Sequence, residues 1–164
     1  MFMSWFVLHL RTRSEKKVAQ VCEAHGLECY LPLRTETKIY QRRKVTVHKP
    51  MFPGYLFVCF SEEERKTVLQ TGHVVRIMKP SDEELLVHEL DQIRMALEAD
   101  ETLGTASAIT EGRRVRITAG SFMGIEGFVE SARKKGTVIL NIEIIGAAAV
   151  VEVDRDYVEL LDDE

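Results

Sequence analysis

The side chains best suited to chemistry in this sequence are lysines and arginines that occur in two short clusters. One cluster follows the first apolar segment and the other lies in a polar stretch: Arg11, Arg13, Lys16 and Lys17, and then Arg42, Arg43 and Lys44. Cationic side chains at exposed turns are suited to contact the phosphates of a nucleic acid. Solvated surface charge is the alternative interpretation for each residue taken alone.

The basic residues are concentrated in the N-terminal half, although the whole chain carries a formal net charge of −4. Residues 1–80 contain 14 Lys and Arg against 7 Asp and Glu, whereas residues 81–110 contain 1 against 8. Residues 111–164 contain 7 against 11. This division predicts one surface that faces a polyanion, with unevenly distributed solvated charge as the alternative.

The residue types used in catalysis and metal binding lack the spacing that such chemistry requires. The histidines are scattered at positions 9, 25, 48, 73 and 88. The odd number of cysteines and their spacing indicate reduced thiols in cytosol: Cys22, Cys29 and Cys59. Gly-x-Gly-x-x-Gly, phosphate-loop and Gly-x-Ser-x-Gly motifs do not occur. We therefore expect a protein that is not an enzyme and binds no metal and no cofactor.

The sequence also lacks the signals of membrane insertion and secretion. No apolar run approaches the roughly 20 residues that a membrane-spanning helix needs. Residues 1–5 have neither the cationic segment nor the cleavage site of a secretion signal. We therefore expect a cytoplasmic protein without a membrane partner.

The apolar pattern of residues 1–99 switches between strand and helix. It predicts strands over residues 5–10, 29–49, 54–60 and 73–78, the first buried on both faces, with a turn at 41–44. It also predicts a helix over 15–25 capped by Ser14, and helices after capping boxes at Ser61 and Ser81. The predicted order is β-α-β-β-β-α-β-α. This order indicates an α+β domain with helices on one side of a mostly antiparallel sheet.

Residues 100–110 lose this periodicity and are dominated by small and polar side chains, which predicts a linker. Over residues 111–164 apolar residues alternate and glycines recur, a pattern typical of a small all-β barrel. The run over 138–145 is rich in β-branched side chains, which favour strand over helix. The predicted domains are therefore residues 1–99 and 111–164, joined by the linker.

Two motifs and the opening segment Trp5-Phe6-Val7-Leu8 carry a family resemblance. The first motif is Phe52-Pro53-Gly54-Tyr55, and the second is Gly-x-Phe-x-Gly-x-x-Gly over residues 120–127. Together they resemble the NusG family of transcription elongation factors, in which the second motif corresponds to a KOW domain with an SH3-like barrel. The resemblance covers nearly the whole chain in the same order. Residues 29–33 and the basic segment after them are most similar to operon-specific members of the RfaH, UpxY and LoaP kind.

The resemblance implies a monomeric elongation factor that grips the clamp helices of RNA polymerase through a hydrophobic depression. The residues implied for this site are His9, Phe52, Pro53, Tyr55 and Phe57. Burial in the core is the alternative for the aromatic ones. The two basic clusters would face the non-template DNA strand or the upstream fork, and binding would promote processive elongation and antitermination. A ribosomal-type KOW module that binds RNA, without acting on polymerase, is the alternative function.

The resemblance further implies that the KOW domain recruits RNA, a ribosomal protein or the Rho terminator. Candidate RNA contacts, with solvated turn charge as the alternative, are Arg113, Arg114 and Arg116, and then Arg133, Lys134 and Lys135. RfaH folds the corresponding region as a helical hairpin that masks its polymerase site. The strand pattern predicts instead that this chain's KOW domain is a barrel even when free.

Overall fold

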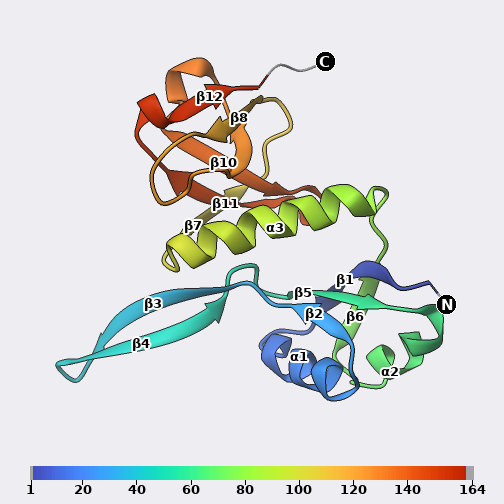
Figure 1. Cartoon of the computed structure of the whole chain (residues 1–164). Helices are drawn as coiled ribbons and strands as arrows, with labels where there is room; N and C mark the ends of the chain where they lie inside the picture. The colour runs from blue at the N-terminus through green and yellow to red at the C-terminus, as the bar shows by residue number, and fades with distance from the viewer. Residues whose placement is uncertain (1, 162–164) are drawn as a thin grey trace. The chain divides into compact units, whose positions relative to one another are not determined.

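Residues 2–161 are described by a computed structural model, in which the chain divides into two compact units (Figure 1). The first unit contains Met1–Leu33 and Pro50–Val87, and the second contains Arg34–Lys49 and His88–Glu164. Residue 1 lies outside the described residues, and so do residues 162–164, the last three of the predicted KOW domain.

A four-stranded antiparallel sheet forms the centre of the first unit, in the order β2-β5-β1-β6. Its strands are β1 (Ser4–Leu10), β2 (Glu28–Tyr30), β5 (Tyr55–Phe60) and β6 (Val74–Met78). Two helices lie on the same face of this sheet, α1 (Glu15–Ala24) and α2 (Arg65–Leu69), the second preceded by the 3-10 turn η1 (Glu62–Glu64) (Figure 1). This architecture confirms the predicted α+β fold.

Alternation along β1 decides which side chains meet the helices. Phe6 and Leu8 belong to one buried cluster with Val18 of α1 and Val68 of α2. The opposite face is buried at its centre as well, because Val7 of β1 and its partner in β5 have no exposed surface. The prediction of a first strand buried on both faces is therefore confirmed.

Four strands separate α1 from α2, one more than the predicted order. The additional strand arises because β2 ends before Leu31 and Pro32, and a new strand starts at Leu33. A proline has no backbone N–H to donate to a ladder, so it separates the two strands. The strand that starts there, β3 (Leu33–Tyr40), pairs with β4 (Arg43–Pro50) in a separate two-stranded sheet.

The long helix α3 (Glu83–Ala99) begins in the first unit and continues into the second. Its cap differs from the prediction, which assigned Ser81. The Oδ1 atom of Asp82 accepts a hydrogen bond of 3.0 Å from the Leu85 amide. The capping residue is therefore one position later than predicted, because a carboxylate serves the same amides as a serine hydroxyl.

The second unit contains a six-stranded antiparallel sheet, in the order β12-β8-β9-β10-β11-β7. Its strands are β7 (Gly104–Ser107), β8 (Arg113–Ile117), β9 (Glu126–Val129), β10 (Thr137–Ile142), β11 (Ala147–Glu152) and β12 (Val158–Leu160). Short 3-10 turns lie between them, η2 (Ala132–Lys134), η3 (Glu143–Ile145) and η4 (Arg155–Tyr157). The prediction of an all-β C-terminal segment is confirmed.

Gly127 of β9 shows why glycine recurs in this sheet. A Cβ atom at this position would lie 2.7 Å from the Ile139 carbonyl oxygen and from side-chain atoms of Val138 and Leu140. No side chain fits at that distance, so β9 can approach β10 this closely only with glycine. The KOW-like glycine therefore has a packing role.

Part of the predicted linker belongs to this C-terminal sheet. Strand β7 pairs with β11, from Ser107 opposite Ala147 to Gly104 opposite Val150. All four residues of β7 are exposed, so no apolar alternation marks the strand in the sequence. The backbone hydrogen bonds to β11 attach this strand to the sheet, and the amino-acid composition of the segment does not reveal them.

The part of α3 that lies in the second unit contacts the C-terminal sheet through hydrogen bonds. The carboxylate of Glu89 accepts one from the Glu143 amide, at 3.1 Å for Oε2. The Oε1 atom of Gln92 accepts one of 2.8 Å from the Glu126 amide. These two side chains satisfy amides that the strand ladder leaves without a partner.

Candidate functional site

An aromatic pair marks one end of the first unit's sheet. His9 and Tyr55 are directly opposite each other on β1 and β5. Their rings stack with centroids 5.2 Å apart and planes inclined by 21°. Both side chains are half-buried, so part of this pair stays accessible at the surface.

The backbone next to this pair is held by a buried carboxylate at the start of α1. Gly54 has φ of +87° and donates its amide hydrogen to Oε2 of Glu15 at 3.1 Å. Its carbonyl accepts the Leu10 amide at 2.7 Å. Glu15 is 5% exposed, and this contact connects the helix start to the Phe52-Pro53-Gly54-Tyr55 motif.

The first basic cluster lies on the turn that leads from β1 into α1. The Arg11 amide donates to the His73 carbonyl at 2.8 Å, and Arg13 has φ of +64°. The Ser14 hydroxyl donates to the Arg11 carbonyl at 2.5 Å and makes no cap hydrogen bond to the helix. Ser14 therefore occupies the predicted N-cap position, but its side chain closes the basic turn and does not cap the helix. All four cations of the cluster are exposed, namely Arg11, Arg13, Lys16 and Lys17.

The predicted polymerase-binding set divides by burial. His9 and Tyr55 are half-buried and Pro53 is exposed. Phe52 and Phe57 are buried, at 4% and 0% exposure. The accessible members therefore lie around the stacked pair, while the two phenylalanines lie in the interior beside it.

Sequence reasoning did not select Ser14 and Glu15 as site residues. Both are polar and buried, at 4% and 5% exposure. The sequence predicts Ser14 as a helix cap and places Glu15 only as the first residue of that helix. The role of Glu15 depends on Gly54, which lies 39 positions away in the sequence.

The second basic cluster lies in the second unit, at the tip of the β3–β4 hairpin. The turn consists of Gln41 and Arg42, with φ of +47° and +65°, which is the conformation of a two-residue hairpin turn. Arg42, Arg43 and Lys44 are exposed there. The predicted turn position is confirmed.

In the C-terminal sheet, carboxylates already pair with two of the predicted RNA contacts. Arg116 lies 2.9 Å from Glu126 and 3.3 Å from Glu159. The hydrogen bond that Arg116 donates to the Glu126 carboxylate raises the pKa of this guanidinium. Lys134 lies 2.7 Å from Glu130. A phosphate would have to compete with these carboxylates.

The other predicted contacts in this sheet are accessible. Arg113, Arg114 and Arg133 are exposed and Lys135 is half-buried. Among residues 2–161 they have no recorded ion pair.

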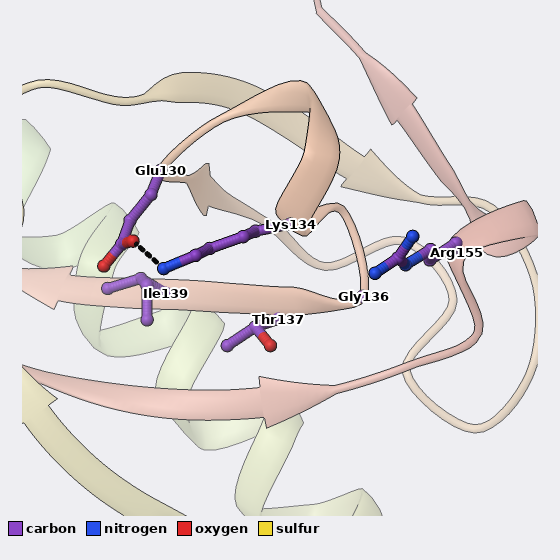
Figure 2. Close-up of a pocket in the computed structure, with 6 residues that line it drawn as sticks. All are labelled: Glu130, Lys134, Gly136, Thr137, Ile139 and Arg155. Atoms are coloured by element: carbon purple, nitrogen blue, oxygen red, sulfur yellow. Dashed lines mark hydrogen bonds and ion pairs between the residues drawn. The ribbon is translucent and has the colours of Figure 1, made fainter.

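A pocket of about 320 Å³ lies on the same sheet. Figure 2 shows the Lys134–Glu130 pair at one end, above Ile139, and Arg155 beside Gly136 at the other. The walls therefore combine one matched ion pair, one further cation and an apolar floor.

Comparisons with known proteins identify the family. The family model described as "Transcription termination factor nusG" matches residues 3–95, which is more than half of the chain. The chain is 30% identical to the transcription termination/antitermination protein NusG of Thermus thermophilus, covering 96% of this chain and 98% of the relative. A crystal structure of an MjSpt4:Spt5 complex is also similar, with 16% identity, 97% of each chain covered and a TM-score of 0.33, which is too low to support an argument.

The family-model match and the identity to the Thermus protein show that the chain is of the transcription-factor class. The chain belongs to the NusG family.

Within the described residues, no helix is long and apolar enough to cross a membrane. The same residues contain no group of three His, Cys, Asp or Glu side chains placed to hold a metal ion.

Proposed function

We propose that the chain is a transcription elongation and antitermination factor whose first unit binds the clamp helices of RNA polymerase. The observation that carries the proposal is the half-buried His9–Tyr55 pair beside the Gly54 turn. Aromatic side chains with a polar atom are typical anchors of protein interfaces. Pro53 extends the same surface, and buried Phe57 supports it from within.

The proposed mechanism is a shift of population without catalysis. A factor that binds the closed polymerase clamp better than the open one stabilises the processive state by that difference in affinity. Pausing and termination, which require the clamp to relax, then become less frequent. Relatives described as termination and antitermination proteins are consistent with action at this step.

The basic turn supports a second contact of the first unit. Arg11, Arg13, Lys16 and Lys17 are exposed around the start of α1, where they can contact phosphates of the non-template DNA strand. The hairpin cations are proposed to act in the same way. This contact would orient the factor on the elongation complex without reading base sequence.

The C-terminal sheet is proposed to recruit RNA, a ribosomal protein or Rho. If the partner is RNA, Arg113, Arg114, Arg133 and Lys135 are the candidate contacts, because carboxylates pair with Arg116 and Lys134. Cytoplasmic location, a monomeric state and membership of the operon-specific branch stay predictions.

The experiment that tests the proposal is single-round transcription across a terminator, together with co-purification with core RNA polymerase. We expect the chain to co-purify and to increase readthrough. Tyr55→Ala should weaken polymerase binding by roughly 1–3 kcal/mol, a typical hot-spot cost, and should abolish the added readthrough. Tyr157→Ala is the matched control, because Tyr157 is 42% exposed and lies in the second unit.

Unchanged polymerase affinity of a folded Tyr55→Ala protein would remove this tyrosine from the site. A wild-type chain that binds RNA but not polymerase would favour the ribosomal-type KOW alternative.

A further inference from the structure

The β3–β4 hairpin exposes large apolar side chains at its tip. Ile39 is 77% exposed and Tyr40 is 67% exposed. Tyr40 is the last residue of β3, directly before the turn at Gln41 and Arg42. Single exposed apolar residues are common on protein surfaces. Tyr40 differs from these because its exposed ring lies at a hairpin tip next to several cationic residues.

The hairpin is strongly cationic, and its acidic residue is already paired. Residues 34–49 contain six Lys and Arg against one acidic residue. That residue, Glu36, lies 2.8 Å from Lys49 and 3.9 Å from Lys38. Among the residues that the structure describes, no recorded ion pair involves Arg42, Arg43 or Lys44. The positive charge of the tip is therefore available to an anionic partner.

The turn presents the ring and the charges together. Strand β3 ends at Tyr40 and β4 begins at Arg43, so these two residues flank the two-residue turn. Both turn residues have positive φ, the geometry whose twist matches that of the flanking strands. Successive side chains of a strand point to opposite faces, so Ile39 lies on the face opposite Tyr40.

We propose that the hairpin tip binds single-stranded nucleic acid, with one unpaired base stacked on Tyr40 and the neighbouring phosphates held by Arg42, Arg43 and Lys44. This inference rests on the proposed function and specifies the ligand of one of its nucleic-acid contacts. Basic surfaces with aromatic platforms are typical of single-strand binding, because every base offers a flat face. In a duplex both faces of each base are already stacked, so the ring has no partner there.

The first experiment places a fluorescent reporter at the ring. Tyr40→Trp is prepared in the full chain, with Ile39→Trp as the matched control on the opposite face. The chain's single native tryptophan, Trp5, contributes the same background to both. Titration at low salt with oligo-dT or oligo-U of about 20 nucleotides should quench the Tyr40→Trp emission and leave the Ile39→Trp emission nearly unchanged.

The second experiment measures affinity by fluorescence anisotropy of labelled oligonucleotides. Tyr40→Ala should weaken single-strand binding roughly tenfold or more, whereas Tyr40→Phe should retain it. Affinity for a duplex of the same length should be low and insensitive to Tyr40→Ala. Replacing Arg42, Arg43 and Lys44 by Gln should reduce the slope of log affinity against log salt by about 2 for single strands. The dT and U arms distinguish DNA from RNA as the source.

Three results would overturn the inference: no binding of either oligonucleotide at low salt, equal loss of duplex and single-strand binding in Tyr40→Ala, or unchanged single-strand binding in that variant. The last would indicate that the exposed ring docks a protein. Co-purification with polymerase separates this inference from the proposed function. Tyr40→Ala should lose single-strand binding and keep polymerase binding, whereas failure of the wild type to bind polymerase contradicts the proposed function alone.

Discussion

The conformation of Gly54 holds the aromatic pair and the basic turn in one arrangement. Its φ of +87° lies in a region that side chains rarely adopt. An added Cβ would meet the Leu10 carbonyl oxygen at 3.7 Å and His9 Cδ2 at 3.8 Å, which are ordinary contacts. The requirement for glycine therefore comes from the backbone and not from lack of space.

We expect Gly54→Ala to destabilise the first unit by roughly 1–2 kcal/mol, the cost of a left-handed backbone for a residue with a Cβ. Urea unfolding followed by Trp5 fluorescence measures this, because Trp5 is the chain's single tryptophan and lies on β1. Gly104→Ala is the control, since Gly104 has neither a positive φ nor a neighbour within 4 Å of an added Cβ. Equal midpoints for the two variants would contradict the backbone argument.

The thiol of Cys29 provides a second test at the scale of single residues. Burial, followed by the negative charge of Glu23, raises the pKa of this thiol to about 12. At pH 8 the thiolate, which is the reactive form, is then roughly a thousandfold scarcer than in an ordinary cysteine. We expect correspondingly slow alkylation by iodoacetamide of the native chain. Labelling in denaturant serves as the control, and rapid labelling of native Cys29 would show the pKa to be near normal.

Sequence reasoning selected the residues of the candidate site, but it could not decide their exposure. Tyr55 and Phe57 lie on the same face of β5, and one is half-buried while the other is fully buried. Period-2 alternation assigns a face, but whether that face is covered depends on elements distant in sequence. The role of Glu15 was missed for the same reason, because its partner Gly54 lies across the fold.

At the scale of elements, periodicity predicted most helices and strands, and local chemistry was less reliable. The turn at residues 41–44 was correctly placed from its charge and the flanking alternation. Its conformation was not indicated, because Gln41 and Arg42 adopt positive φ without the Asn or Gly that usually signals it. Of the predicted caps, the box at Ser61 is confirmed, with the Ser61 amide donating to Glu64. The hydroxyl of Ser14 bonds backward to Arg11, and Asp82 replaces Ser81.

The contact of α3 with the C-terminal sheet is testable through one carboxylate. Glu89 is 8% exposed and accepts the Glu143 amide. Glu89→Ala should leave that amide without its acceptor, at a cost of roughly 1–3 kcal/mol. Hydrogen exchange of the Glu143 amide should become faster, and the free energy of protection derived from it should fall by a similar amount. Glu98→Ala, an exposed site on the same helix, should leave the exchange unchanged, and equal exchange in both variants would show that the contact contributes nothing.

At the scale of the whole molecule, the division of the chain was only partly visible in the sequence. The change of period after residue 110 predicted the strands that follow it, but the sheet already begins with β7 at Gly104. The sequence could not show that residues 104–107 join that sheet, because they are small and exposed and their pairing uses the backbone. Asn141 completes the attachment: it is 4% exposed, donates to the Ile109 carbonyl at 2.8 Å and accepts the Ile109 amide at 3.0 Å.

These contacts predict where an independently folding C-terminal fragment must begin. A fragment of residues 103–164 keeps β7 and both hydrogen bonds of Asn141, whereas a fragment of residues 111–164 loses them. The shorter fragment then has a buried amide without partners, which costs roughly 1–3 kcal/mol. For a domain of about 60 residues, this lowers the thermal midpoint by roughly 5–20 °C.

The same fragments test whether the C-terminal region is a sheet even when free. Residues 138–142 lie in β10 and, apart from Asn141, are apolar and mostly β-branched. Gly146, with φ of +66°, interrupts any helix that the following alanines could start. We therefore expect the free 103–164 fragment to give a strand-rich circular dichroism spectrum. Its amide chemical shifts over 111–161 should match those of the intact chain, except at Glu126 and Glu143, whose acceptors on α3 the fragment lacks. If these residues were helical in the intact chain and became strands only in the fragment, the proposed polymerase site would be controlled by masking. With a constitutive sheet, the proposed site at Tyr55 needs no refolding step, and we then expect nucleic acid and partners to determine where the chain acts.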